Sequence, residues 1–430
     1  MIPYKERENT PRENALSAEG TVRDILTDVR ARGDEAVQDY TERFDGFRPP
    51  CLRVEEGELK KARSSLDKET EEALVFAAER IENFARAQRG CLKDLRYEIS
   101  PGVVAGHRLI PLRSCGCYVP AGRYPLPSSA LMSVIPARVA GVKRIAACSP
   151  GQKDGKGIHP AVLAALDIAG ADEVYSMGGA QAIGAFAWGT ETIPPVDMIV
   201  GPGNRYVAEA KRQASGSVGI DMLAGPSEAV ILADGSPDPE WVAADLLAQS
   251  EHDADAWAVL ITTSSSLAEA VAREVARQGK LLSTGEAALE SWRRNGRILI
   301  ADSLEEGVAA ANEIAPEHLQ IMTEDDALWA ERMENYGSLF LGAWSPVAFG
   351  DYLTGPNHIL PTGRNARFSS GVSVGTFLRT SSFQELTPEG AASLVPPCAR
   401  LAAAEGLFGH RRSAELRGED PGRGESSPSR

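Results

Sequence analysis

The stretch from Asp245 to His252, with the sequence DLLAQSEH, carries the first side chains that could do chemistry. Asp238 and Pro239 precede it as an N-cap and a first-turn proline, and its apolar residues have helical spacing. Gln249 lies three residues before His252, so the sequence predicts that one face of a helix presents both side chains. An amide oxygen beside an imidazole nitrogen suits a borderline metal such as zinc. For this pair alone, polar residues in water at a helix end are the simpler interpretation.

The histidines strengthen the case for a site. The chain has six of them, and four lie in polar, loop-flanked segments beside Gln, Glu, Asp or Asn. A single histidine of this kind is usually structural or solvated, but four of six in such company favour a functional cluster. The four are His252, His318, His358 and His410.

The segment APEHLQI places Glu317 next to His318 at a predicted junction between a helix and a strand. In a loop, two adjacent side chains can be aimed at two sides of one substrate. Histidine is the natural proton acceptor near neutral pH, and a neighbouring glutamate can polarise a water molecule. A histidine that faces the dipole at a helix C-terminus is the structural alternative.

Two further segments contain candidate ligands. In GDYLTGPNHILPTG, the glycines and prolines predict a tight loop in which Asp351 is either a hard oxygen ligand or part of an Asx turn. The same loop offers His358 to the polar groups of a substrate. In LAAAEGLFGH, Glu405 and His410 are five residues apart, and a helix that ends near Gly406 could present the histidine from a turn. On spacing alone, a C-cap followed by an exposed histidine is the stronger interpretation.

The elements that would position these side chains alternate between strands and helices. Residues 17 to about 97 are predicted to be helical, because apolar residues recur every three or four positions. Beyond residue 108, β-rich runs alternate with helices, which predicts an α/β fold with parallel sheets covered on both faces. The predicted strands are 108–112, 117–119, 144–148, 173–176, 197–200, 229–233, 256–262, 297–301 and 319–322. The predicted helices after residue 108 are 160–170, 180–190, 205–214, 239–252, 267–277, 304–314 and 398–407.

Two turns in this alternating region could bind a phosphate. The usual dinucleotide fingerprint GxGxxG is absent from the sequence. GGAQ at 178–181 and GPGN at 201–204 each follow a predicted strand and precede a predicted helix. Either turn could place backbone N–H groups against a phosphate, or could be a tight connection without a ligand.

Composition narrows the class of protein. A chain of 430 residues has room for two to four domains with large cores. Its net charge of -15 argues against nucleic acid and against an anionic membrane surface as partners. The sequence has no apolar run of membrane-spanning length and no signal-peptide core, and six cysteines in so long a chain do not make a disulfide framework. These features predict a soluble, cytoplasmic enzyme.

Taken together, the segments resemble the histidinol dehydrogenase family, and the resemblance runs in order over nearly the whole chain. The first hundred residues and the tail carry it only weakly. The matching segments are YVPAGRYPLPSSALMSVIPARVAGV, GGAQAIGAFAWGTETIP, VDMIVGPGNRYVAEAKR, GIDMLAGPSEAVILAD, DLLAQSEHD, APEHLQI, GDYLTGPNHILPTG and LAAAEGLFGH.

The resemblance implies a role for each candidate residue. It implies one zinc ion per subunit, held by Gln249, His252, Asp351 and His410. It implies that His318 accepts the alcohol proton and that Glu317 activates water. The positions that match substrate contacts are Ser227, His358 and Glu405, together with His318 and the four zinc ligands. The positions that match NAD+ contacts are Tyr118, Gln181 and Asn204.

The resemblance also implies a reaction and an assembly. L-Histidinol would be oxidised by two NAD+ through an aldehyde to L-histidine, in a homodimer whose partner chain donates His410 and Glu405. Two incomplete Rossmann-like domains would form the body, with a helical N-terminal region and small terminal extensions used in dimerisation. The implied divisions are an arm at 1–16, a first domain at 17–117 and 227–372, a second, NAD-side domain at 118–226, a C-terminal segment at 373–417 and a disordered tail at 418–430.

Three alternatives stay open at this point. Dihydroxypropanesulfonate dehydrogenases look similar, and GRYPL at 122–126 and GTFLRTSSFQEL at 375–386 have some character of that branch, whereas GPSE with Ser227 favours the histidinol branch. A zinc hydrolase with Glu317 as its base would leave the alternating body without a purpose. A non-catalytic metal-binding protein would not need the Glu317–His318 pair.

Overall fold

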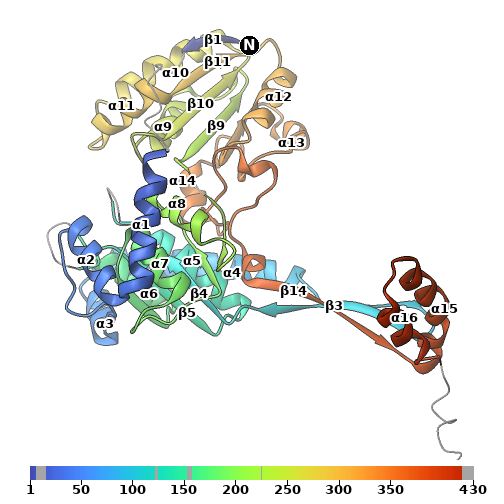
Figure 1. The fold of residues 1–430 in the computed structure, drawn as a ribbon. Helices are drawn as coiled ribbons and strands as arrows, with labels where there is room; N and C mark the ends of the chain where they lie inside the picture. The colour runs from blue at the N-terminus through green and yellow to red at the C-terminus, as the bar shows by residue number, and fades with distance from the viewer. Residues whose placement is uncertain (6–15, 122–123, 153–156, 224, 419–430) are drawn as a thin grey trace, which may run out of the picture. The chain divides into compact units, whose positions relative to one another are not determined.

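The computed structural model describes residues 1–5, 16–121, 124–152, 157–223 and 225–418 of the chain (Figure 1). Two compact units are present. The first contains Met1–Arg89 and Pro111–Phe377, and the second contains Gly90–Ile110 and Leu378–Arg430. The predicted α/β class is confirmed, because parallel sheets with helices on both faces make up the first unit.

Helices dominate the start of the chain, as the apolar periodicity predicts. Gly33 separates the first two helices, and Gly46 ends the second in the left-handed conformation with φ 71°. The helices are α1 (Leu16–Arg32), α2 (Asp34–Asp45), α3 (Glu56–Ser64) and α4 (Lys68–Cys91). The helical prediction is wrong for its last residues, because Leu95–Ser100 forms strand β2.

One sheet, named here the β4 sheet, has the strand order β6-β5-β4-β7-β8 with all strands parallel. Its strands are β4 (Ser114–Tyr118), β5 (Arg144–Ser149), β6 (Glu173–Ser176), β7 (Met198–Val200) and β8 (Gly219–Ile220). The chain places β5 and β6 on one side of β4, then crosses to place β7 and β8 on the other. The crossing puts a topological switch point between β4 and β7, where open parallel sheets bind ligands beyond their carboxyl ends.

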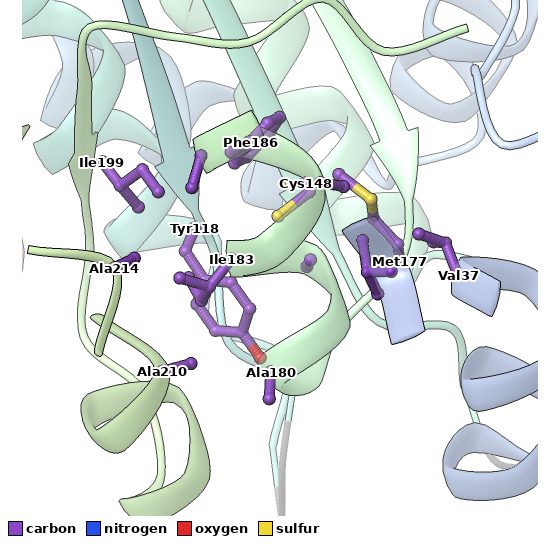
Figure 2. Close-up of a cluster of buried hydrophobic side chains, with 14 of the residues drawn as sticks. Val37, Tyr118, Cys148, Met177, Ala180, Ile183, Phe186, Ile199, Ala210 and Ala214 are labelled. Atoms are coloured by element: carbon purple, nitrogen blue, oxygen red, sulfur yellow. The ribbon is translucent and has the colours of Figure 1, made fainter. Parts of the chain in front are cut away.

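Helices cover both faces of the β4 sheet. Helices α5 (Pro127–Ala140) and α6 (Pro160–Ala169), which connect β4 to β5 and β5 to β6, pack on each other on one face of the sheet. Helices α7 (Gly179–Trp188) and α8 (Arg205–Ala214) share a core with α1 and α2 on the other face. Figure 2 shows this core, in which Ile183 and Phe186 of α7 lie near Tyr118 and Cys148 of the sheet.

A second sheet, named the β9 sheet, has the order β1-β11-β10-β9-β12-β13. Its strands are β1 (Ile2–Lys5), β9 (Glu228–Ala233), β10 (Trp257–Thr262), β11 (Arg297–Ile300), β12 (His318–Met322) and β13 (Ser338–Leu341). β1 pairs antiparallel with β11, and the other strands are parallel. The predicted N-terminal arm is therefore a strand at Ile2–Lys5, and residues 6–15 lie outside the described chain.

Side chains of β9 alternate between two helical layers, as buried parallel strands require. Ile231 packs with α9 (Pro239–Ser250), α10 (Ser265–Gln278) and α11 (Gly285–Asn295). Val230 packs with α12 (Leu304–Ile314) and the region of α13 (Asp326–Ala330) on the opposite face (Figure 1). After β13, the first unit ends with the short helix α14 (Val347–Tyr352) and the 3-10 turns Asn365–Arg367 and Val374–Phe377.

The second unit is a small α+β body. Strands β2, β3 (Val103–Pro111) and β14 (Leu378–Leu386) form a sheet with the order β14-β3-β2. Helices α15 (Pro388–Ala404) and α16 (Phe408–Glu415) pack on each other. The predicted helix at 398–407 is confirmed for 398–404, which is the end of a helix that begins ten residues earlier, and wrong for its last three residues. The predicted tail beyond residue 418 lies outside the described chain, and none of the described helices is long and apolar enough to cross a membrane.

Candidate active site

Helix α9 delivers the first candidate ligands to the amino-terminal edge of the β9 sheet. Asp238 caps the start of the helix by accepting a hydrogen bond from the N–H of Glu240, as predicted. The helix follows β9 and runs back across the sheet, so its C-terminal end returns to the edge where β9 begins. The prediction that this helix carries both Gln249 and His252 is wrong, because α9 ends at Ser250 and His252 lies two residues beyond it.

Gln249 has the character of a ligand. Its side chain is 2% exposed, and neither its amide oxygen nor its amide nitrogen has a hydrogen-bond partner among the described residues. A buried amide without a partner costs about 1–3 kcal/mol. This cost is offset when the amide binds a metal ion or a substrate, so the residue fits the predicted zinc position.

The pairing of β9 with β12 aligns the two catalytic candidates. His318 is the first residue of β12 and pairs with Ala229 of β9, so it lies in a strand and not in the predicted loop. The N–H of Glu228 donates to Oε2 of Glu317 at 2.9 Å, and the carbonyl oxygen of Glu228 lies 3.2 Å from Nδ1 of His318. The backbone of one residue therefore orients both side chains.

The hydrogen bond to Glu228 fixes the protonation of His318. A carbonyl oxygen can only accept, so Nδ1 carries the proton and Nε2 carries the lone pair. Nε2 is buried without a hydrogen-bond partner among the described residues, and it lies 3.7 Å from Oδ1 of Asp351. Burial, assisted by the charge of His252, lowers the pKa of His318 to about 3. The ring is therefore neutral near pH 7, and Nε2 is free to accept a proton.

Glu317 is a buried carboxyl group held in a fixed position. Its side chain is 8% exposed, and burial raises its pKa well above the usual range. The negative charge of Asp351 raises this pKa further, while hydrogen bonds from the Glu228 N–H and the Ser227 side chain lower it. The predicted substrate residue Ser227 is thus in contact with the predicted water-activating residue.

Asp351 and His358 form a second fixed pair. Asp351 lies in helix α14 and not in the predicted loop, and burial raises its pKa to about 7. Nδ1 of His358 lies 2.9 Å from the carbonyl oxygen of Asp351, and Nε2 lies 3.0 Å from Oγ of Ser129. Because Nδ1 must donate to the carbonyl, Nε2 accepts from the Ser129 hydroxyl. Burial lowers the pKa of His358 to about 4, so its neutral ring ties α14 to α5.

A cavity of about 320 Å³ adjoins this pair and is lined by Asp351, Asn357, His358 and Phe340. The Phe340 ring lies 5.9 Å from the ring of His318, measured between centroids. A cavity of this size suits a small-molecule substrate. Trp344, also in the lining, is 82% exposed at the surface.

Three predicted zinc ligands belong to this region of the first unit. Helix α9 carries Gln249, helix α14 carries Asp351, and the two helices pack on each other. His252 is near enough that its charge lowers the pKa of both His318 and His358. Partial burial of the His252 ring by the surrounding protein lowers the pKa of that ring. Among the described residues, no three His, Cys, Asp or Glu side chains gather as a ready-made metal site. One amide, one imidazole and one carboxylate nevertheless form a donor set that zinc accepts, and the unpaired amide supports the fit.

The remaining two candidates lie in the second unit. Glu405 is the C-cap of α15, and its N–H bonds to the carbonyl of Leu401. His410 is an exposed residue inside α16, so the prediction that a turn presents it is wrong. The expected C-cap near Gly406, which has φ 74°, followed by an exposed histidine, is confirmed.

Tyr118 and Gln181 mark the carboxyl edge of the β4 sheet. Tyr118 ends β4, and its hydroxyl accepts a hydrogen bond of 3.1 Å from the N–H of Gly179, the first residue of α7. Figure 2 shows the hydroxyl beside Ala180. Gln181 is completely buried, and both polar atoms of its amide lack a partner in the described chain. GGAQ is thus a strand-to-helix turn, as predicted, and Gln181 fits a ligand contact as Gln249 does.

Asn204 has a structural task at the start of α8. Its side-chain oxygen accepts hydrogen bonds from the N–H groups of Tyr206 and Val207, at 3.0 and 3.2 Å. The turn GPGN follows β7 and precedes α8, as predicted. This cap uses the side-chain oxygen of Asn204 and two of the free N–H groups at the start of the helix. The side-chain amide nitrogen of the exposed Asn204 is therefore the group that can donate to a ligand.

Sequence reasoning missed the residues that act through their backbone or through distant contacts. Glu228 has one feature in the sequence that could have drawn notice, because it is a charged residue at the start of the apolar strand EAVILA. Its own carboxyl group accepts a hydrogen bond from the N–H of Gly363 at 2.7 Å, and burial raises its pKa to about 7. Ser129 gave no signal, because its partner His358 is 229 positions away.

The sequence and the structure of this chain were compared with those of known proteins. The family model for histidinol dehydrogenase matches residues 8–418. The histidinol dehydrogenase of Agrobacterium fabrum is 48% identical over 411 residues, which cover 95% of this chain and 94% of that protein. Histidinol dehydrogenase 1 of a Nostoc species is 46% identical and covers 94% of this chain and 93% of its own. The crystal structure of histidinol dehydrogenase from Elizabethkingia anophelis matches with a TM-score of 0.90 at 36% identity, over 96% of this chain and 94% of that one. The chain therefore belongs to the histidinol dehydrogenase family, an oxidoreductase family, as its sequence segments predict.

Proposed function

We propose that the protein oxidises L-histidinol to L-histidine through L-histidinal, with zinc and two NAD+ per turnover, as the last step of histidine biosynthesis. One observation carries the proposal beyond family membership. The neutral ring of His318 has an unpaired, buried Nε2, the adjacent Glu317 lies on the Nδ1 side of the ring, and the backbone of Glu228 orients both side chains. This is the arrangement of a base and a water-positioning group at one site.

The chemistry needs two hydride transfers and one water molecule. One histidinol, one water and two NAD+ give one histidine carboxylate, two NADH and three protons. Bound NAD+ supplies the hydride acceptor in each oxidation. Nε2 of His318 takes the hydroxyl proton as the alcohol becomes the aldehyde. Glu317 then orients and deprotonates the water that hydrates the aldehyde, and His318 again takes the hydroxyl proton of the hydrate.

Four side chains would hold the zinc ion. Gln249, His252 and Asp351 would supply an amide oxygen, an imidazole nitrogen and a carboxylate oxygen, and His410 a second imidazole. Zinc held there would anchor and orient the imidazole and amine of the substrate, and would favour the ionised form of nearby carboxyl groups. Ser227, His358 and Glu405 complete the proposed substrate contacts.

We further propose a cytoplasmic homodimer in which His410 and Glu405 enter the site of the partner chain. Mixing inactive His252→Ala chains with inactive His410→Ala chains tests this arrangement. Each heterodimer then has one site with both lesions and one site with neither, so activity returns. If heterodimers form but stay inactive, the sites are built within single chains.

The NAD+ side of the site is proposed at Tyr118, Gln181 and Asn204, on the domain at 118–226. The sequence prediction joins 17–117 to 227–372 as the first domain, but α1 and α2 share a core with α7 and α8, and β4 is the central strand of the β4 sheet, so these elements pack with the NAD-side domain. The proposal keeps 227–372 as the first domain and 373–417 as the dimerisation segment. Support comes from the switch point of the β4 sheet, which lies between Tyr118 and the GPGN turn.

A substrate comparison tests the proposal against its nearest alternative. Zinc-loaded protein is assayed for NADH formation with L-histidinol and with 2,3-dihydroxypropane-1-sulfonate. We expect turnover with histidinol, and we expect kcat/KM for the diol to be far below kcat/KM for histidinol. Turnover of the diol alone would keep the fold and the mechanism but overturn the substrate. The named relatives are histidinol dehydrogenases, so the sulfonate, hydrolase and non-catalytic alternatives are not favoured.

A further inference from the structure

Gly201, the first residue of the GPGN turn, is held by a buried ion pair. Nζ of Lys211 donates to the carbonyl oxygen of Gly201 at 3.0 Å. Oδ2 of Asp221 accepts from the N–H of Gly201 at 2.8 Å, while its Oδ1 pairs with Nζ of Lys211. The side chains of Lys211 and Asp221 are 2% and 0% exposed. One charged pair therefore satisfies both backbone groups of a single glycine.

The location of Gly201 explains why such a clamp is needed. Strand β7 ends at Val200, so the next peptide groups lose their ladder partners at a buried position. Gly201 has φ 120°, and an added Cβ would lie 2.1 Å from the carbonyl oxygen of Tyr118. The backbone thus leaves the sheet in a conformation that only glycine adopts freely, directly against the end of β4.

The clamp also connects the elements around the turn. Lys211 lies on α8, the helix that the turn begins, and Asp221 directly follows β8. Asp221 is itself fixed, because its Oδ1 accepts from the N–H of Met222 at 2.6 Å. The turn is therefore braced by the helix after it and by the next strand of the sheet.

A buried ion pair is a costly way to build stability alone. Desolvation of two charges consumes most of their attraction, and apolar replacements of such pairs are often neutral or stabilising. The pair makes more sense as a device for fixing one backbone geometry. The geometry it fixes is the turn that carries Asn204, at the switch point beside Tyr118.

We propose that Lys211 and Asp221 are positioning residues for the dinucleotide: they hold the GPGN turn in its binding conformation before NAD+ arrives. This inference rests on the proposed NAD+ site. Without the clamp, the turn would have to be ordered at the moment of binding, which lowers affinity. The chemistry at Glu317 and His318 would be unaffected.

The test is the double variant Lys211→Met/Asp221→Asn, which leaves no lone buried charge. The matched control is Arg144→Met/Glu173→Gln, which removes an ion pair of 2.8 Å at the opposite, amino-terminal edge of the same sheet. NAD+ affinity is measured directly by calorimetry, and KM for each substrate, kcat and zinc content are measured alongside. Thermal unfolding reports the stability of both variants.

We expect NAD+ affinity to fall on the order of tenfold in the clamp variant and KM for NAD+ to rise in parallel. The kcat at saturating NAD+, KM for histidinol and zinc content should stay within about twofold of wild type, as loss of ground-state binding predicts. Unchanged NAD+ affinity, or an equal loss in the control, would overturn the inference and leave the clamp with a structural role. If the double variant does not fold, Asp221→Glu, which keeps both charges but displaces the carboxylate from the N–H of Gly201, should still weaken NAD+ binding severalfold, and wild-type affinity would contradict the inference. If wild type itself binds no NAD+, the proposed function fails instead.

Discussion

Replacing Glu317 by glutamine separates the two half-reactions. Glutamine has nearly the same shape, and its amide oxygen can still accept the 2.9 Å hydrogen bond from the N–H of Glu228. The orientation of His318 depends on the Glu228 carbonyl and not on the Glu317 side chain. The variant should therefore keep the base for alcohol oxidation and lose the group that deprotonates water.

The size of the effect follows from the environment of the carboxyl group. General base catalysis is worth about 10²–10⁴-fold, so aldehyde oxidation should slow by that factor, while alcohol oxidation stays within about tenfold.

Burial raises the pKa of Glu317, so ionising this group costs folding free energy as pH rises. Glutamine removes that cost, and the variant should be at least as stable as wild type at pH 8.

The assay follows each half-reaction separately. L-Histidinal is supplied directly to measure the second oxidation, and a single turnover with L-histidinol and limiting NAD+ reports the first. The expected pattern is a near-normal first step with accumulation of aldehyde. Equal slowing of both steps in a stably folded variant would refute the assignment of Glu317 to water activation.

Three further predictions follow from single buried groups. Gln249→Leu should reduce the amount of bound zinc at least about tenfold, which zinc analysis of the purified protein checks. The same variant should leave the metal-free protein as stable as wild type or about 1 kcal/mol more stable, because it removes an unpaired buried amide, and unfolding in the presence of a chelator measures this. Burial raises the pKa of Asp45 to about 6 from 3.8, so the folded state loses stability as pH rises through that range. Asp45→Asn should thus add about 2 kcal/mol at pH 8 and nothing at pH 3, as urea unfolding at both pH values will show. His318 should have the opposite pH dependence, because its pKa is about 3 in the folded protein and 6.5 in the unfolded chain. The stability contributed by its neutral form is lost as pH falls from 6.5 towards 3. His318→Gln should therefore reduce the loss of unfolding free energy over that pH range.

Most of the fold was predictable because its signals are local. Helix α8 at 205–214 and α12 at 304–314 have the predicted bounds, since Asn204 and Ser303 cap them and apolar spacing runs through them. β2 was missed although its sequence LRYEIS alternates apolar and polar residues, because the helical periodicity was carried past Cys91, where α4 ends. α9 ends at Ser250 without a glycine or proline to announce it, which is why His252 was placed on the helix.

The candidate site was predictable in its residues but not in its geometry. Family segments identified Glu317 and His318, yet the contacts that orient them come from Glu228, about ninety positions earlier. That contact depends on the register between β9 and β12, which no local pattern encodes. The clamp on Gly201 was invisible for the same reason, because Lys211 and Asp221 look like ordinary surface charges in the sequence.

The most direct test of the central claim is the stoichiometry of NADH formation by zinc-loaded protein. Absorbance at about 340 nm is followed with a limiting, known amount of L-histidinol and excess NAD+. The proposed four-electron oxidation predicts two NADH for every histidinol consumed, with L-histidine as the product. One NADH per histidinol with histidinal left in solution, or no NADH at all, would contradict it.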